Sequence, residues 1–237
     1  MKMELNVKLF LLKQIYKIYD DFVSTLDVAC QKYCSQCCTN NVVKTTLEGY
    51  LIAENILKAE QSDLFERVKT GVSKKRFLPQ TTTNKIAELC IKGKDLPQED
   101  HTHAEIICPL LTDDECPIYT VRPFGCRCLV SKHDCRQKGY ADVDAFVITV
   151  NHLILQFIEH VDANGFSGNL TDILIFMASK ENRCTYETNT LDNSDTLLIS
   201  NLPIKVLMIP PEHRTQIQPI INDLYNIKVP ANKMNDS

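Results

Sequence analysis

The sequence lacks any long apolar run. Nowhere in its 237 residues does an apolar stretch reach the length that a membrane-spanning helix needs. The first residues, MKMELNVKLFLLKQIYKIYDDF, also lack the pattern of a secretory signal, because polar residues interrupt the apolar positions and no small-residue cleavage site follows. We therefore expect a cytoplasmic chain that makes no membrane contact.

Strong charge of one sign and the familiar catalytic fingerprints are also missing. The formal net charge is −4, which gives no reason to expect a nucleic-acid partner. The chain shows no Ser-His-Asp grouping, phosphate-binding loop, dinucleotide-binding fingerprint, internal repeat or low-complexity tract. The sequence therefore identifies neither a substrate nor a protein partner, and it leaves open whether the chain is an enzyme.

The sequence is rich in cysteine, with eleven in total. Nine of them fall into two groups about seventy residues apart: Cys30, Cys34, Cys37 and Cys38, then Cys108, Cys116, Cys126, Cys128 and Cys135. Stable disulfides are rare in a reducing compartment, and an odd number of cysteines cannot pair completely. A chain of this size also has enough core to fold without covalent links. Clustering of this kind favours metal binding over redox pairs or simple packing.

Apolar residues recur at helical spacing through most of the chain. Helices are predicted within seven ranges: 5–29, 46–60, 62–72, 81–96, 141–161, 170–180 and 210–227. Residues 181–195 read as a polar loop, and 196–200 and 204–209 as short strands or buried turns. We expect a mainly α-helical, bundle-like domain around a cysteine-ligated metal site. Residues 1–165 would form the cysteine-cluster domain, and 166–237 a helical extension packed on it.

Local signals refine this picture at several positions. Continuing the apolar stripe of the first helix would place Cys30, Cys34 and Cys37 on its core-facing side. Thr45 and Glu48 form a capping box, and Gly93 suits a helix end. The segment 100–140 is irregular, with a small hairpin around its TDDE tetrapeptide. The two remaining cysteines, Cys90 and Cys184, are expected to be buried among apolar side chains.

The motifs CQKYCSQCC and CPLLTDDECPIYTVRPFGCR resemble those of the YkgJ-like cysteine-cluster family. This family is described as a zinc- or iron-chelating domain, and the resemblance covers roughly residues 30–135. It implies eight metal ligands by position: Cys30, Cys34, Cys37, Cys38, Cys108, Cys116, Cys126 and Cys135. Cys128 lies outside the pattern. Eight thiols could hold two metals, or one cluster with spare or bridging thiols.

Thiolate ligands are typical of zinc and of iron–sulfur clusters. The spacing in the second cysteine group is too irregular for paired zinc knuckles, so we favour an iron–sulfur cluster over zinc. The centre could be structural, redox-active or involved in metal handling. Cys30, Cys34 and Cys37 also have the spacing of radical S-adenosylmethionine enzymes, although no barrel-like alternation follows. Some flagellin lysine methylases carry a similar cysteine block, so a cluster-containing modifying enzyme is the alternative.

Three side chains near the second cysteine group are candidates to support the ligands. Arg122 and Arg127 bracket Cys126 and could donate hydrogen bonds to its sulfur, since four thiolates around a metal leave negative charge to balance. Ordinary pairing with surface carboxylates is the alternative for both arginines. Tyr119 could pack over the site or donate its hydroxyl.

Overall fold

The computed structural model describes residues 3–72, 75–99, 106–192 and 197–230. About half of the protein is helical, which confirms the predicted mainly helical fold. The helices of the described part are α1 Leu5–Val23, α2 Thr46–Lys58, α3 Asp63–Val72, α4 Thr83–Ile91, α5 Phe124–Arg127, α6 Cys135–Lys138, α7 Ala145–Val161, α8 Leu170–Ala178, α9 Lys180–Glu187 and α10 Arg214–Tyr225. Among them, none is both long enough and apolar enough to cross a bilayer.

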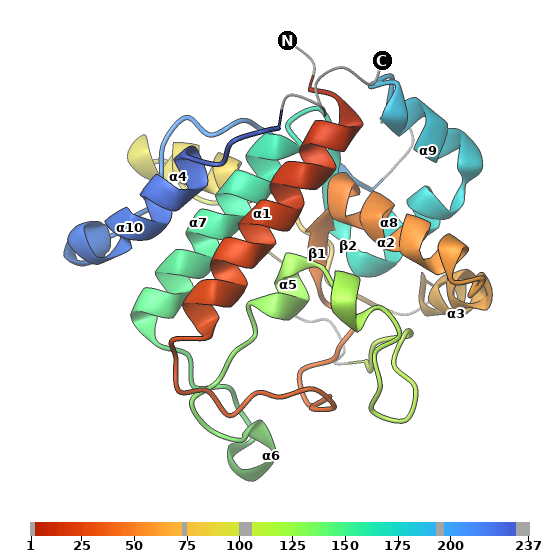
Figure 1. Cartoon of the computed structure of the whole chain (residues 1–237), viewed down its shortest axis with the longest axis horizontal. Helices are drawn as coiled ribbons and strands as arrows, with labels where there is room; N and C mark the ends of the chain where they lie inside the picture. The colour runs from red at the N-terminus through yellow and green to blue at the C-terminus, as the bar shows by residue number, and fades with distance from the viewer. Residues whose placement is uncertain (1–2, 73–74, 100–105, 193–196, 231–237) are drawn as a thin grey trace.

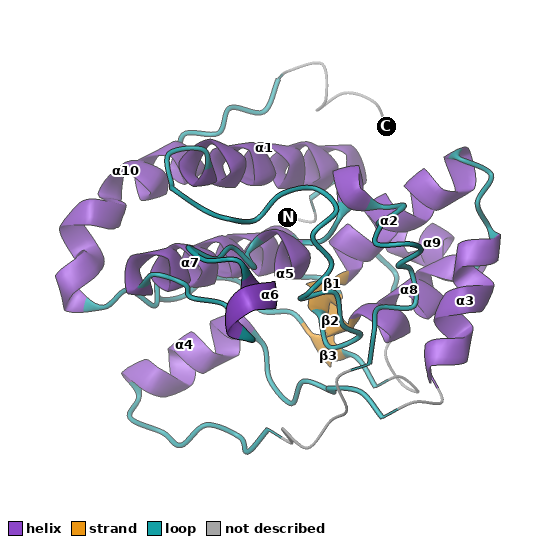
Figure 2. Ribbon diagram, turned by 90° about the horizontal axis from the view of Figure 1, so that it is seen from below, coloured by secondary structure: helices purple, strands orange, loops and turns teal. Residues whose placement is uncertain are grey.

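Two groups of helices flank a small sheet (Figures 1 and 2). Helices α1 and α7 lie side by side, and α10 also packs on α1. On the other side, α8 packs on α2 and α3. The loops that carry both cysteine groups gather at one end of the molecule, which is the lower end in Figure 1. The longer helices therefore form a scaffold beside the cysteine segments, and the short helices α5 and α6 carry Cys126 and Cys135.

The sheet joins early and late parts of the chain. Its strands are β1 Val43–Thr45, β2 Phe166–Asn169 and β3 Ile199–Ser200, paired antiparallel in that order. In this register Lys44 lies opposite Gly168. Residues on either side of position 165 thus share one sheet, and they contribute side chains to the same main core.

Local contacts fix several helix ends, and the two predicted ones, the start of α2 and the end of α4, are confirmed. The capping box of α2 is complete: the Thr45 hydroxyl accepts from the Glu48 amide, and the Glu48 carboxylate accepts from the Thr45 amide. Asn169, the last residue of β2, caps α8 by accepting from the Thr171 amide at 2.9 Å. Gly93 follows α4 with φ +60°, a left-handed conformation that glycine adopts without strain.

The first helix is shorter than predicted. It ends at Val23, and the hydroxyls of Ser24 and Thr25 turn back to the carbonyls of Asp21 and Phe22. The prediction that this helix continues or resumes through the cysteines, with three thiols on its core-facing side, is therefore wrong. The first cysteine group lies in a series of turns.

Three other predictions were also wrong. The expected polar loop 181–195 contains α9, which begins at its cap Ser179 and is anchored by the buried Tyr186. With a single buried residue, α9 has no apolar stripe to detect. Cys90 and Cys184 are exposed, because they lie on the solvent faces of α4 and α9.

The hairpin predicted around TDDE is reduced to one turn. Thr112 and Glu115 form an isolated bridge, and Asp113 and Asp114 turn the chain with φ of 48° and 61°. Two strands, β1 and β2, were not predicted at all, because three or four residues are too few to show an alternating pattern. Residues 204–209, predicted as a strand or buried turn, form no regular element.

Candidate metal centre

The two cysteine groups meet through their backbones. The Cys108 amide donates to the Cys38 carbonyl at 2.9 Å, and the Asn40 amide donates to the Ile106 carbonyl at 2.8 Å. These bonds form an isolated antiparallel bridge centred on Thr39 and Ile107. The two segments therefore converge, as shared metal ligands would require, although their role as ligands is a separate question.

Further contacts hold the start of the first group against the end of the second. The Ala29 amide donates to the Ser131 carbonyl at 2.8 Å. In return, the Ser131 amide donates to the Cys30 sulfur at 3.2 Å. The Arg136 guanidinium reaches the Tyr33 carbonyl at 3.4 Å. Tyr33 itself has φ 73°, so the chain bends sharply between Cys30 and Cys34.

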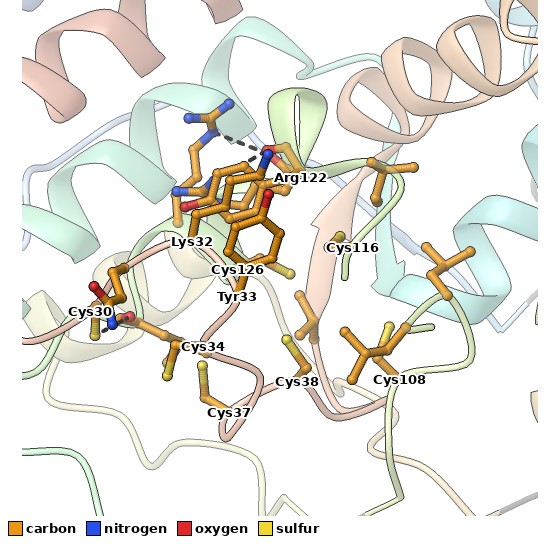
Figure 3. Close-up of a pocket in the computed structure, with 18 of the residues that line it drawn as sticks. Cys30, Lys32, Tyr33, Cys34, Cys37, Cys38, Cys108, Cys116, Arg122 and Cys126 are labelled. Atoms are coloured by element: carbon orange, nitrogen blue, oxygen red, sulfur yellow. Dashed lines mark hydrogen bonds between the residues drawn. The ribbon is translucent and has the colours of Figure 1, made fainter. Parts of the chain in front are cut away.

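One cavity of about 570 Å³ lies where these segments meet (Figure 3). Seven of the eight candidate ligands line it: Cys30, Cys34, Cys37, Cys38, Cys108, Cys116 and Cys126. The eighth, Cys135, is not in the lining but is close enough to Cys30 to act on it electrostatically. Cys128, which falls outside the family pattern, also lies outside the lining, and its thiol donates to the Gly125 carbonyl at 3.5 Å. The cavity lining therefore agrees with the motif for Cys128 but differs from it for Cys135.

The thiols fall into two neighbouring sets in Figure 3. Cys30, Cys34 and Cys37 lie together on one side, and Cys38, Cys108, Cys116 and Cys126 surround the other. The adjacent residues Cys37 and Cys38 join the two sets, and their thiols are hydrogen-bonded to one another. A sulfur-rich surface therefore runs along the cavity.

Helix α5 carries Cys126, and buried contacts fix its position. The Phe124 amide donates to the Glu48 carboxylate of α2 at 2.7 Å, and the Phe124 ring is fully buried. A methyl group on Gly125 would come within 2.8 Å of the Val43 carbonyl oxygen, so only glycine permits this close approach of α5 to β1. Cys126 is thereby placed beside the sheet edge at the inner end of the cavity.

Burial keeps these thiols protonated in the absence of a cation. It raises the pKa of Cys108 and of Cys116, and it raises the pKa of Cys126 most strongly, with nearby thiols adding to the effect. For Cys37, the hydrogen bond with Cys38 is the largest cause of a raised pKa, followed by burial. A bound metal ion would reverse this preference, because it stabilises the thiolate.

Arg122 and Tyr119 both line the cavity. The Arg122 guanidinium stacks on the Tyr119 ring, 3.8 Å from its centroid, and donates to the Tyr119 carbonyl. Its positive charge acts to lower the pKa of Cys37 and of Cys116. This placement is compatible with the proposed role of Arg122 in balancing thiolate charge.

Arg127 also borders the cavity, but its hydrogen bonds go to oxygen atoms. It donates to the carbonyls of Thr120 and Arg122 at 2.9 and 3.1 Å and pairs with Asp20 of α1 at 3.1 Å. Its guanidinium lies 4.3 Å from the Tyr16 ring centroid. These contacts agree with the alternative considered above, in which the arginine pairs with a carboxylate.

We expect Arg127→Lys to lower the free energy of unfolding by about 1–2 kcal/mol, because an ammonium cannot reproduce the planar contacts to two carbonyls and a ring. Denaturant unfolding of the metal-free protein measures this loss. If Arg127 acts mainly on the scaffold, the same loss appears with and without metal. A variant that unfolds like the wild type when metal-free but binds metal more weakly would assign Arg127 to the ligands instead.

Sequence reasoning missed Lys44, which the structure places beside the inner thiols. The lysine lies on β1 with 2% of its surface exposed, and its amine has no hydrogen-bond partner. It is close enough to Cys108 and Cys126 for each group to act on the other electrostatically. Burial lowers the pKa of Lys44 to about 7. A lone lysine in VVKTT gives no sequence signal of burial.

The sulfurs are gathered around the cavity but do not form a finished coordination site. Within the described ranges, no three histidine, cysteine, aspartate or glutamate side chains are arranged to hold one ion. All eleven cysteines are free thiols. Soft sulfur donors fit zinc or an iron–sulfur cluster, but coordination would require the cysteine loops to move inward.

Comparison with known proteins adds no relative, since no family model, curated protein or solved structure matches the chain. The likeness to the cysteine-cluster family thus rests on the motifs themselves.

Proposed function

We propose that this protein binds a metal centre through the thiols that line the cavity, with an iron–sulfur cluster favoured over zinc. The observation that carries the proposal is the meeting of two remote cysteine groups around one cavity. Seven thiols in one lining far exceed what chance placement or simple core packing would give. The ligands would be drawn from these seven and Cys135.

The size of the cavity favours a cluster over a single ion. Its volume of about 570 Å³ is many times the roughly 30 Å³ that one water molecule occupies in the liquid. A single ion would require four sulfurs to converge on one point, and in the part of the chain that the structure describes no three are arranged to do so. A cluster of several iron and sulfide atoms presents more widely separated binding positions, so the loops would need to move less.

The simplest role for such a centre is structural. The cysteine segments have little regular structure, and the hydrogen bonds described above are few for their length. A metal bonded to both segments would stabilise their arrangement, because the unfolded chain offers no such site. Redox and metal-handling roles use the same ligands. Free thiols in such number also suit a reducing compartment such as the cytoplasm.

Purification without oxygen, followed by metal and sulfide analysis, tests the proposal. We expect the wild-type protein to retain metal, and Cys126→Ser and Cys34→Ser to lose most of it and unfold more easily. Cys90→Ser and Cys184→Ser are matched controls, because both thiols are exposed and lie outside the cavity lining. These two variants should keep the wild-type metal content.

The outcomes separate the candidate centres. A brown protein with acid-labile sulfide indicates an iron–sulfur cluster, and a colourless protein with stoichiometric zinc indicates a closed zinc site. Binding of S-adenosylmethionine to the loaded protein would support the modifying-enzyme alternative. Wild-type protein that retains no metal, or unchanged metal content in Cys126→Ser and Cys34→Ser, would contradict metal binding by these thiols.

A further inference from the structure

Lys44 differs from the other fully enclosed lysine of the described chain in lacking a partner. Lys8 is equally buried, but its amine lies 3.4 Å from Asp162 and 3.5 Å from the Asn189 side-chain oxygen. It also lies 5.0 Å from the Tyr186 ring centroid. The Lys44 amine is fully shielded from solvent and makes no hydrogen bond. Burying an unsatisfied amine costs free energy, so such a group calls for an explanation.

Glu48 does not supply that explanation. Its carboxylate lies near enough to interact electrostatically with Lys44. However, both of its oxygens already accept hydrogen bonds, from the Tyr16 hydroxyl, the Phe124 amide and Thr45. No hydrogen bond or ion pair joins it to Lys44. Glu48 is thus close to Lys44, but its oxygens already accept hydrogen bonds from α1, from α5 and from the start of α2.

Besides Glu48, the ionisable groups that act on the amine are two cysteine thiols. Lys44 interacts electrostatically with the thiols of Cys126 and Cys108, which belong to different segments and both line the cavity. Gly125 holds Cys126 close to β1, the strand that carries Lys44. A protonated amine has three hydrogens to donate, and a thiolate or sulfide is a good acceptor for them. The Lys44 amine lacks hydrogen-bond acceptors in the metal-free protein. On binding metal, the ligand sulfurs would become thiolates and could accept its hydrogen bonds.

We propose that Lys44 is a positioning residue for the metal centre, whose buried ammonium donates to the ligand sulfurs of Cys108 and Cys126 and offsets their negative charge. This inference rests on the proposed metal binding and deepens it. Four thiolates around zinc or an oxidised four-iron cluster leave about two negative charges. In a site with little water, a buried cation is the most direct way to balance part of that charge.

The proposal predicts opposite effects of one substitution on the metal-free and metal-bound protein. Lys44→Met keeps an unbranched side chain out to the ε-carbon and removes the amine. Without metal, we expect Lys44→Met to be at least as stable as the wild type, because an unpaired buried amine is lost. Its affinity for Zn²⁺, measured by competition with a chelator, should fall on the order of tenfold to a hundredfold. If a cluster forms, its reduction potential should become more negative, because a nearby positive charge is gone.

Lys8→Met is the matched control. It removes an equally buried lysine whose amine already has a carboxylate partner, Asp162. We expect the opposite pattern: the metal-free protein is destabilised, and Zn²⁺ affinity of the folded protein stays within about twofold of wild type.

The results distinguish failure of this inference from failure of metal binding. Wild-type protein that binds neither Zn²⁺ nor a reconstituted cluster overturns both. Equal Zn²⁺ affinity of Lys44→Met and wild type, with an unshifted potential, overturns the role of Lys44 and leaves the proposed function standing. Strong destabilisation or misfolding of metal-free Lys44→Met also overturns it, since the amine would then have a structural partner within the protein.

Discussion

Asp162→Ala is expected to lower the free energy of unfolding by about 3–5 kcal/mol, the cost of breaking a buried ion pair from one side. Asp162 is completely buried at the end of α7. One carboxylate oxygen accepts from the Tyr186 hydroxyl at 2.6 Å and lies 3.4 Å from the Lys8 amine. Removing the carboxylate would leave the ammonium of Lys8 enclosed without its counter-charge.

The second oxygen of Asp162 secures the start of α2. It accepts from the Thr46 hydroxyl at 2.6 Å and from the Leu47 amide at 2.8 Å. A carboxylate at this position satisfies a free amide of the first turn and interacts favourably with the helix dipole. Asp162 therefore connects α1, α2, α7 and α9. Its removal should lower the free energy of unfolding by more than the loss of a single hydrogen bond would.

Denaturant unfolding of metal-free protein measures the effect, and Asp21→Ala is the control. Asp21 forms an exposed pair with Lys17 on α1, so its loss should cost less than about 1 kcal/mol. In the double variant Asp162→Ala, Lys8→Met, part of the stability should return, because no unpaired ammonium remains. Equal stability of Asp162→Ala and Asp21→Ala would show that the buried network contributes little.

Glu48→Ala is expected to cost about 3–4 kcal/mol and, in addition, to weaken metal binding. Glu48 accepts from the Tyr16 hydroxyl of α1 at 2.8 Å and from the Phe124 amide of α5 at 2.7 Å. Its other oxygen completes the capping box of α2. Each buried donor left without an acceptor costs about 1–3 kcal/mol. Because Phe124 begins the helix that carries Cys126, its release should also loosen the inner ligands.

Glu159→Ala is the control for Glu48→Ala. It tests whether weaker metal binding follows from lower stability alone. Glu159 is another buried carboxylate that accepts from two backbone amides, those of Asn84 and Leu202, both at 2.8 Å. It does not line the cysteine cavity. We expect Glu159→Ala to destabilise the protein to a similar degree while its folded form keeps wild-type metal affinity. If both variants lose metal affinity equally, Glu48 has no special connection to the cavity.

The sequence predicted those parts of the fold in which a local pattern determines local structure. The capping box of Thr45 and Glu48 marks the start of α2 correctly, and the apolar stripe of α7 places most of that helix. Helix α9 could not be predicted, because Tyr186 alone is buried on it. The end of α1 was misplaced because hydroxyl contacts, which apolar periodicity does not register, terminate the helix at Val23.

For the candidate site, the motif resemblance singled out the seven cysteines that line the cavity, together with Cys135, but it did not predict how they are brought together. The motif leaves out Cys128, which also lies outside the cavity lining, but it includes Cys135, which does not line the cavity. The backbone bridge between Thr39 and Ile107 depends on how the intervening helices pack, so no local signal announces it. Lys44 was overlooked for the same reason, since its burial follows from the contacts of β1 with β2 and α5.

The bridge between Thr39 and Ile107 has a consequence for the thermodynamics of ion capture. It closes the chain from Asn40 to Ile106 into a ring that contains β1, α2, α3 and α4. Bringing the ends of so long a segment together costs conformational entropy. The bridge forms when the protein folds, so this cost does not recur when an ion binds. If the protein binds metal as proposed, association would then require only short-range closure of the thiols, because the two segments are already held together in the metal-free protein.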